Sequence, residues 1–224
     1  MEKLIKKEND IFGILQKFID KNLNFITVGG YAVSAFKHRF SVDADIVVKS
    51  EDLSKFEDIL RKTGFKKTMT KELENVYSSK FIRYEKDQAS VDIMIDALQS
   101  RTTNASFSFN LILDNSIKKD IIGIEKEILS RIPIKELLIA MKIHSGRLTD
   151  FRDIAALAKD SNLQLIKKFL FIGDLKVINE NLNKLNSVVN DKNFVDSFKG
   201  VFVEKKFDID FQQVKRISEL KKSL

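Results

Sequence analysis

The chain of 224 residues contains no cysteine and a single proline. Without cysteine it can form no disulfide, no catalytic thiolate and no zinc–thiolate site, which fits a reducing compartment. No segment approaches the roughly eighteen uninterrupted apolar residues of a membrane span, and the first residues lack the apolar core and cleavage site of a signal peptide. The Gly-x-x-x-x-Gly-Lys-Ser/Thr motif of P-loop ATPases is also missing. We therefore expect a cytoplasmic protein without a membrane partner, in which any metal binds oxygen ligands, with His38 or His144 as additional ligands.

Basic residues exceed acidic ones only mildly. The 39 Lys and Arg against 32 Asp and Glu give a formal net charge of +7, which is spread along the chain rather than gathered in a tail. Nucleic-acid binding normally needs a concentrated basic stripe. This balance therefore permits an RNA partner without demanding one, and a solvated helical surface accounts for it equally well.

Apolar periodicity predicts alternating helices and strands in the first part of the chain. A helix over the first twenty-odd residues precedes a strand at 25–28, which the pair Gly29-Gly30 ends. The next segments are expected to be helix, strand, helix, strand and strand, at 31–38, 43–49, 53–60, 76–86 and 90–98. The stretch 99–132 has weaker patterns, from which strands are expected at 107–113 and around 121–128.

After Pro133 the apolar pattern becomes wholly helical, with helical spacing over most of the segment from Leu137 to Leu220. We therefore expect an α/β domain over residues 1–132 and a helical domain over residues 133–224. With 43% apolar residues, the chain can bury one sheet-based core and a smaller helical one.

An acidic doublet stands in the second expected strand. Asp43 and Asp45 are two residues apart, so both face one side of the strand, while apolar neighbours such as Val42 face the sheet interior. Two like charges side by side repel unless a cation neutralises them. Mg²⁺ is usually held by one or two carboxylates together with substrate phosphates, and Gly29-Gly30 offers bare backbone N–H groups where those phosphates could lie. The pattern predicts a nucleotide site.

A third carboxylate lies in a later strand. Asp92 is enclosed by Val91 and Ile93, whereas Asp96 comes where the strand is expected to end, so we favour Asp92. Three carboxylates suffice to hold two Mg²⁺ or Mn²⁺ ions for an in-line attack on the α-phosphate of a nucleoside triphosphate (NTP). Asp92 would then ligate the first metal and help to deprotonate the acceptor hydroxyl.

Each of these signals alone has a plainer interpretation. An Asp-x-Asp on a strand is usually a solvated face, and Gly-Gly alone indicates a turn. Their combination favours catalysis, because a strand precedes the glycines, a helix separates them from the doublet, and a third strand carries Asp92.

The order of these elements and motifs resembles that of the DNA polymerase β-like nucleotidyltransferase superfamily. In its finer form, Gly29-Gly30-Tyr31-Ala32 followed by Arg39-x-Ser41-x-Asp43-x-Asp45 is similar to the AbiEii-type branch, which includes bacterial toxins; Ala44 replaces a usually larger residue. The resemblance covers about residues 20–160. It implies an α/β (α+β) fold, with a small mixed-sheet nucleotidyltransferase core followed by a C-terminal helical domain. It also implies NTP (ATP) binding, with catalytic and metal-binding Asp43, Asp45 and Asp92, and with Gly29, Gly30 and Ser41 receiving the triphosphate.

A second block, Ile134–Ile154, resembles the helical segment of that branch, in which a lysine and an Arg-rich Asp-x-x-Asp turn face the active site. The resemblance implies that Lys142 contacts nucleotide phosphates and that Asp153 supports the site. Asp150 and Asp153 are one helical turn apart and share a face, but Arg152 lies between them instead of before the first. A salt-bridged helix surface is the alternative interpretation.

The expected function is that of a metal-dependent nucleotidyltransferase, an enzyme that moves a nucleoside monophosphate from an NTP to an acceptor hydroxyl and releases pyrophosphate. The sequence does not identify the acceptor, which could be RNA such as tRNA, a protein or a small molecule, and the mild positive charge slightly favours RNA. The alternative is a non-catalytic RNA- or protein-binding module on the same fold, such as the antitoxin-like half of a toxin–antitoxin pair. A nuclease-like hydrolase is a third interpretation.

Overall fold

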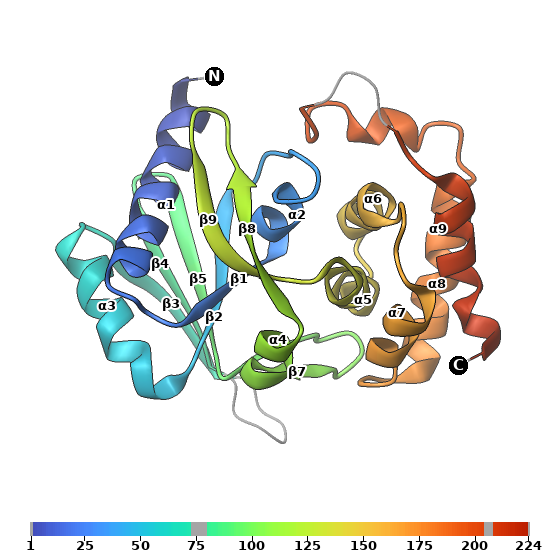
Figure 1. The fold of residues 1–224 in the computed structure, drawn as a ribbon, viewed down its shortest axis with the longest axis horizontal. Helices are drawn as coiled ribbons and strands as arrows, with labels where there is room; N and C mark the ends of the chain where they lie inside the picture. Colours follow the sequence, from blue (N-terminus) through green and yellow to red (C-terminus); the bar gives the residue numbers. More distant parts are fainter. Residues whose placement is uncertain (1, 73–79, 204–207, 224) are drawn as a thin grey trace. The chain divides into compact units, whose positions relative to one another are not determined.

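The computed structural model describes residues 2–72, 80–203 and 208–223. Its contacts divide the chain into two compact units (Figure 1). The first, here called the sheet unit, holds residues 1–35, 39–98 and 108–133. The second, here called the helical unit, holds residues 36–38, 99–107 and 134–224.

A five-stranded mixed sheet forms the centre of the sheet unit. Its strand order is β1-β2-β5-β4-β3, in which β2 and β5 are parallel and all other neighbours antiparallel. The strands are β1 (Phe25–Val28), β2 (Asp43–Val48), β3 (Lys66–Glu72), β4 (Lys80–Lys86) and β5 (Ala89–Ile95). This mixed sheet and the helical C-terminal region described below confirm the expected fold class.

Two helices, α1 (Glu2–Asp20) and α3 (Leu53–Lys62), cover one face of this sheet (Figure 1). The ring of Phe18 on α1 lies 5.8 Å from that of Phe25 on β1 and 4.9 Å from that of Phe56 on α3, edge to face in both cases. Side chains alternate between the faces of a strand. The residues of β2 that share the Phe25 face, Ala44, Ile46 and Val48, are apolar, whereas Asp43, Asp45 and Val47 belong to the opposite face.

The elements of the stretch 99–132 differ from two of the expectations. Residues 107–113 are expected to be a strand, but they form the end of β7 (Ser106–Ser108) and most of α4 (Phe109–Asp114). The helix begins here because Ser108 caps it by accepting a hydrogen bond from the Leu111 amide at 3.2 Å. Residues around 121–128 are not one strand but the turn between β8 (Ser116–Ile122) and β9 (Glu127–Pro133). Short apolar runs do not distinguish helix from strand by periodicity alone.

Other boundaries also differ from the sequence expectations. The helix expected at 31–38 is α2 (Gly29–Ser34), and the strand expected at 90–98 ends at Ile95, because Asp96 has a φ of +64° and separates β5 from β6 (Ala97–Gln99). Of the strand expected at 76–86, residues 76–79 lie outside the described part of the chain. Strand β3 has no counterpart among the sequence expectations.

The helical unit consists mainly of short helices. They are α5 (Lys135–Ser145), α6 (Leu148–Leu157), α7 (Leu163–Leu170), α8 (Leu175–Val189) and α9 (Phe211–Ser218), with 3₁₀ turns at Val195–Phe198 and Glu219–Ser223. A further 3₁₀ turn, Ser50–Asp52, precedes α3 in the sheet unit. Helix α5 packs against α6, α7 and α8, and it ends at Gly146, whose φ of +65° suits glycine. None of the helices that the structure describes is long and apolar enough to cross a membrane.

Candidate active site

The register of β2 and β5 gathers the predicted carboxylates. Asp43 pairs with Ser90 and Asp45 with Asp92, and residues opposite each other on neighbouring strands share a face of the sheet. Asp43 and Asp45 are partly buried, and Asp92 is buried. Val42, which precedes β2, is 51% exposed, so the expectation that it faces the sheet interior is wrong.

The glycine pair lies directly against this face. Gly29 has a φ of +64°, and a Cβ atom added to it would stand 2.0 Å from Oδ2 of Asp45. A Cβ atom on Gly30 would stand 2.3 Å from Oγ of Ser41. Only glycine therefore allows the backbone to approach both side chains this closely. Ser41 in turn donates from Oγ to the Asp43 carbonyl at 3.3 Å.

Asp43 has two polar neighbours from other elements. Ser90 on β5 donates its hydroxyl to Oδ1 of Asp43 in a short hydrogen bond. Lys7 on α1 places Nζ 4.0 Å from the same oxygen, with its side chain 15% exposed. Burial first, and then the charges of Glu8 and Asp43, raise the pKa of Tyr31, which therefore stays neutral and donates to the Ser41 carbonyl at 3.2 Å.

Asp92 has a partner that sequence reasoning missed. Arg83 on β4 stands opposite it in the sheet register and donates from Nε to Oδ1 and from Nη2 to Oδ2, both at 2.7 Å. Burial raises the pKa of Asp92, and the hydrogen bonds from Arg83 offset part of that rise. The observed two-residue turn at Asp87-Gln88 pairs position 83 with position 92. The expected strands, 76–86 and 90–98, leave three residues between them and do not give this register.

A hard divalent cation fits the donor chemistry of Asp43 and Asp45, because both carboxylates share one face, are partly exposed and supply oxygen ligands. Asp92 lies beside Asp45, but both of its oxygens accept from Arg83. Among the described residues, no three His, Asp or Glu side chains form a group that could hold a metal. The structure thus assembles two of the three predicted ligands, while a guanidinium group holds the third.

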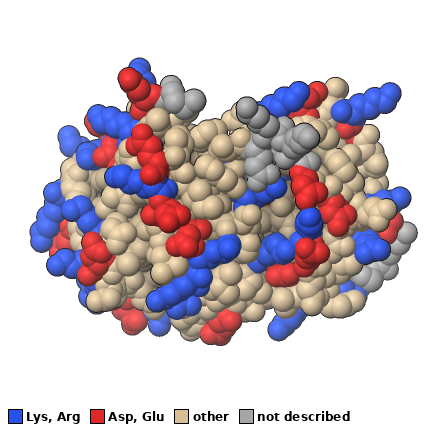
Figure 2. All heavy atoms as spheres, turned by 45° about the horizontal axis from the view of Figure 1, so that its top comes forward, with Lys and Arg blue, Asp and Glu red and all other residues tan. Residues whose placement is uncertain are grey.

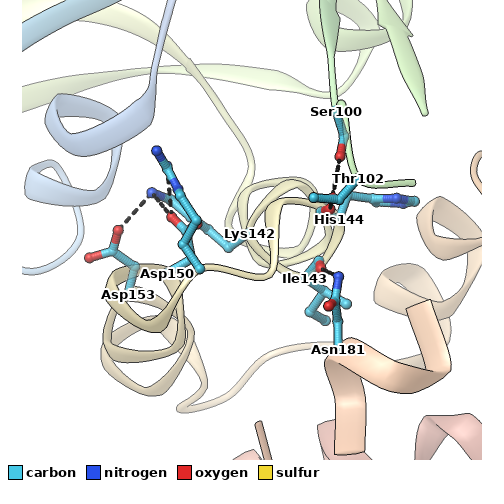
Figure 3. Close-up of polar contacts among 9 residues, drawn as sticks. Ser100, Thr102, Lys142, Ile143, His144, Asp150, Asp153 and Asn181 are labelled. Carbon is cyan, nitrogen blue, oxygen red and sulfur yellow. Dashed lines mark hydrogen bonds and ion pairs between the residues drawn. The ribbon is translucent and has the colours of Figure 1, made fainter. Parts of the chain in front are cut away.

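The residues of the second sequence block form a cluster within the helical unit (Figure 3). Nζ of Lys142 on α5 lies 2.9 Å from Oδ1 of Asp150 and 2.7 Å from Oδ2 of Asp153, both on α6. Arg147 donates to Asp150 from Nε at 2.7 Å and from Nη2 at 3.1 Å. Lys142 and both aspartates are buried, so this cluster is an internal network of ion pairs.

The pKa values of the cluster follow from its charges. Burial alone would lower the pKa of Lys142, but Asp153 and Asp150 outweigh it and raise the pKa above its ordinary value. Burial likewise works against the charged form of Asp150, but Lys142 and Arg147 outweigh it and lower the pKa to about 2. The lysine and the Asp150 carboxylate are therefore charged at neutral pH, and each stabilises the other.

Two other candidates from the sequence have structural partners. His144 is buried; its Nε2 lies 3.1 Å from the Phe169 carbonyl, which can only accept, so Nε2 carries the proton and Nδ1 accepts from Thr103 at 2.8 Å. Burial lowers the pKa of His144 to about 4 and keeps it neutral. Asp96 accepts a hydrogen bond from the Ser50 amide at 2.8 Å.

No protein-family profile and no curated protein matches the sequence, but solved structures match the fold. The solution structure of the antibiotic-resistance factor ANT(2'')-Ia matches with a TM-score of 0.55 and 14% identity, over 82% of this chain and 97% of that chain. A crystal structure of a Helicobacter pylori protein assigned as a nucleotidyltransferase matches with a TM-score of 0.50 and 17% identity, over 100% of this chain and 97% of that chain. At these identities the likeness concerns the fold, and this chain therefore has a nucleotidyltransferase-type fold.

Proposed function

We propose that this protein is a divalent-cation-dependent nucleotidyltransferase. It would transfer a nucleoside monophosphate from an NTP to an acceptor hydroxyl: the bond from the α-phosphorus to the acceptor oxygen forms, the bond to pyrophosphate breaks, and the hydroxyl proton is released. The observation that carries the proposal is the placement of Asp43 and Asp45 on one face of the sheet, directly against Gly29, within this fold.

Each predicted site residue of the sheet unit would have its own task in this reaction. When bound, Mg²⁺ or Mn²⁺ supplies positive charge that offsets the triphosphate and the leaving pyrophosphate. Asp43 and Asp45 would hold the cation, and Gly29 and Gly30 would receive the triphosphate together with Ser41. Asp92 would complete the metal set and take the proton of the acceptor hydroxyl.

Lys142 and Asp153 enter the proposal as nucleotide-site residues only through the resemblance to the AbiEii-type branch. In the structure Lys142 is held by Asp150 and Asp153. A direct contact of its ammonium group with phosphate would have to compete with two carboxylates at less than 3 Å. Assignment to that branch, a cytoplasmic location and an antitoxin-like partner are further predictions from the sequence.

The acceptor class is the part of the proposal that an experiment must decide. The likeness to an antibiotic-resistance factor is a reason to include small hydroxylated molecules. For RNA, a concentrated basic stripe would be expected, whereas Figure 2 shows Lys and Arg interspersed with Asp and Glu over the face in view. We therefore rank a small molecule before RNA or protein as the acceptor.

The test is a transfer assay with each of the four α-³²P-labelled NTPs and with Mg²⁺ or Mn²⁺. Separate reactions contain hydroxylated small molecules such as aminoglycosides and lincosamides, total RNA, or cell-extract proteins. Asp45→Asn is the inactive variant, and Asp58→Asn, which removes an exposed carboxylate on α3 of the same unit, is the matched control.

We expect label in one acceptor class with the wild type and with Asp58→Asn, but not with Asp45→Asn. Equal labelling by Asp45→Asn would contradict the assignment of the metal site. Absence of label in every reaction, together with absence of metal-dependent NTP binding by calorimetry, would favour the non-catalytic binding module.

A further inference from the structure

The proposed reaction needs Asp92 as a metal ligand and as a base. In this structure, however, a bidentate pair with Arg83 holds Asp92. The two 2.7 Å hydrogen bonds run from Nε to Oδ1 and from Nη2 to Oδ2, so both carboxylate oxygens are engaged. Such fork-to-fork pairing fixes the geometry as well as the charge. The side chain of Asp92 is 8% exposed and that of Arg83 31%, so the guanidinium lies on the more accessible side of the pair.

A cation at Asp92 and the guanidinium group of Arg83 compete for the same carboxylate. Metal ions bind a carboxylate through its oxygen lone pairs, which here accept N–H bonds. Two positive charges brought to the same buried carboxylate would also repel each other. By contrast, Ser90 and Lys7 both approach Asp43 at Oδ1, Lys7 only to 4.0 Å, so neither of them engages both oxygens of that carboxylate.

We propose that Arg83 is a positioning residue that competes with the second divalent cation for Asp92. This inference rests on the proposed function. In the protein without nucleotide, Asp43 and Asp45 bind one cation, and Asp92 is paired with Arg83. A second cation binds more tightly when the guanidinium leaves Asp92. The released guanidinium then needs another anion, which the triphosphate of the substrate supplies.

Binding of Mn²⁺ alone tests the competition without any turnover. Free Mn²⁺ is measured by electron paramagnetic resonance during titration of the purified protein in the absence of NTP. We expect the wild type to bind one Mn²⁺ in the accessible range. Arg83→Gln should bind a second Mn²⁺, with an affinity at least about tenfold higher than the second site of the wild type, because two hydrogen bonds to a charged group no longer compete.

Three further variants make the result specific. Arg83→Lys keeps a positive charge without the planar fork and should give an intermediate affinity for the second Mn²⁺. Arg83→Gln combined with Asp92→Asn should return to one Mn²⁺. Arg61→Gln removes an arginine that is 66% exposed on α3 and pairs with Asp58, and it should titrate as the wild type.

The outcomes separate this inference from the proposed function. One Mn²⁺ in the wild type and an unchanged or weaker second site in Arg83→Gln would overturn the competition and leave the proposed function standing. No Mn²⁺ bound by either protein would overturn both. Circular dichroism and thermal melts verify that each variant is folded, and if Arg83→Gln does not fold, the intermediate affinity of Arg83→Lys decides the question.

Discussion

The two units of this protein each contain a pair of neighbouring aspartates, and the two pairs differ in their surroundings. Asp43 and Asp45 in the sheet unit are partly exposed and lie on one side of a strand. Asp150 and Asp153 in the helical unit are buried on α6, with Lys142 within 3 Å of both. The second pair shares one buried lysine that contacts both carboxylates, whereas in the first pair Lys7 approaches Asp43 only to 4.0 Å.

Spacing alone therefore does not define the role of an acidic pair. Both spacings, i and i+2 on a strand and i and i+3 on a helix, bring two carboxylates to one face. Burial decides the role, because a buried charge needs a partner within the protein and an exposed one can take a cation from solution. We therefore interpret the sheet pair as the binding site and the helical pair as a structural network.

The largest effect expected is on catalysis in the sheet unit. Asp45→Asn should reduce NMP transfer by more than about 100-fold, since loss of a direct metal ligand should exceed the roughly 10–100-fold cost of losing a supporting partner. Its free energy of unfolding should change little, because asparagine keeps the size of the side chain at this partly exposed position and relieves the repulsion from Asp43. Transfer rates and urea denaturation measure the two effects. A large loss of stability with a proportionate loss of activity would mean that this pair, like Asp150 and Asp153, has a structural role.

The next effect is on stability in the helical unit. Lys142→Met should lower the free energy of unfolding by about 3–5 kcal/mol, because two buried carboxylates lose their shared cation. Urea denaturation followed by circular dichroism gives this value. Lys184→Met changes an exposed lysine on α8 and should stay within about 0.5 kcal/mol of the wild type. If Lys142→Met is as stable as that control and has lost NTP affinity, the predicted phosphate contact of Lys142 is favoured instead.

The sheet pair was predictable from the sequence because it depends on a local pattern. Period-two alternation alone places Asp43 and Asp45 on one face, and the strand at 25–28 is predicted with its observed bounds. The pairing of Asp45 with Asp92 is not local. It depends on the parallel register of β2 and β5, which no local pattern of the sequence gives.

The features that the sequence did not predict, strand β3 and the counterions of Lys142, depend on the position of a strand in the sheet and on contacts between helices. Strand β3, with the sequence Lys-Lys-Thr-Met-Thr-Lys-Glu, lies at the sheet edge, where no apolar alternation is required, and it contains an irregularity between Lys67 and Met69. The counterions of Lys142 come from the next helix, after a turn at Gly146. Spacing predicted that Asp150 and Asp153 share a face, but not that this face meets Lys142.

A smaller effect distinguishes two glycines of the sheet unit. Gly29→Ala should lower the free energy of unfolding by at least about 1–2 kcal/mol, the cost of a left-handed conformation for an L-residue, and should displace Asp45, whose Oδ2 is 2.0 Å from the added Cβ. Gly13→Ala on α1 meets nothing within 4 Å and should stabilise the protein by about 0.5–1 kcal/mol. Thermal melts and Mn²⁺ titrations measure both. Unchanged Mn²⁺ binding in a folded Gly29→Ala variant would contradict the close packing of this glycine against the site.

The smallest expected effect concerns the helical pair alone, and it is a shift in the pH at which the ion pairs of Asp150 stop stabilising the folded protein. The pKa of Asp150 is lowered from an ordinary value of 3.8 to about 2, so its ion pairs contribute fully to the free energy of unfolding above about pH 4. As the pH falls from about 4 toward 2, the unfolded chain binds the proton before the folded one does, and the contribution is lost. Arg147→Gln removes a cation that is 69% exposed, so it should move this loss to higher pH by only a few tenths of a unit.

Urea midpoints measured from pH 2 to pH 5 test this shift, with Arg61→Gln as the control, because it breaks an exposed i,i+3 pair with Asp58 that lies outside the network. An equal shift in both variants would mean that general surface charge, rather than the Asp150 network, sets the acid stability. A shift in Arg147→Gln alone would show that even the exposed arginine acts through a buried carboxylate. That result would separate this network from the sheet pair, whose neighbour Asp92 has its pKa raised rather than lowered by its surroundings.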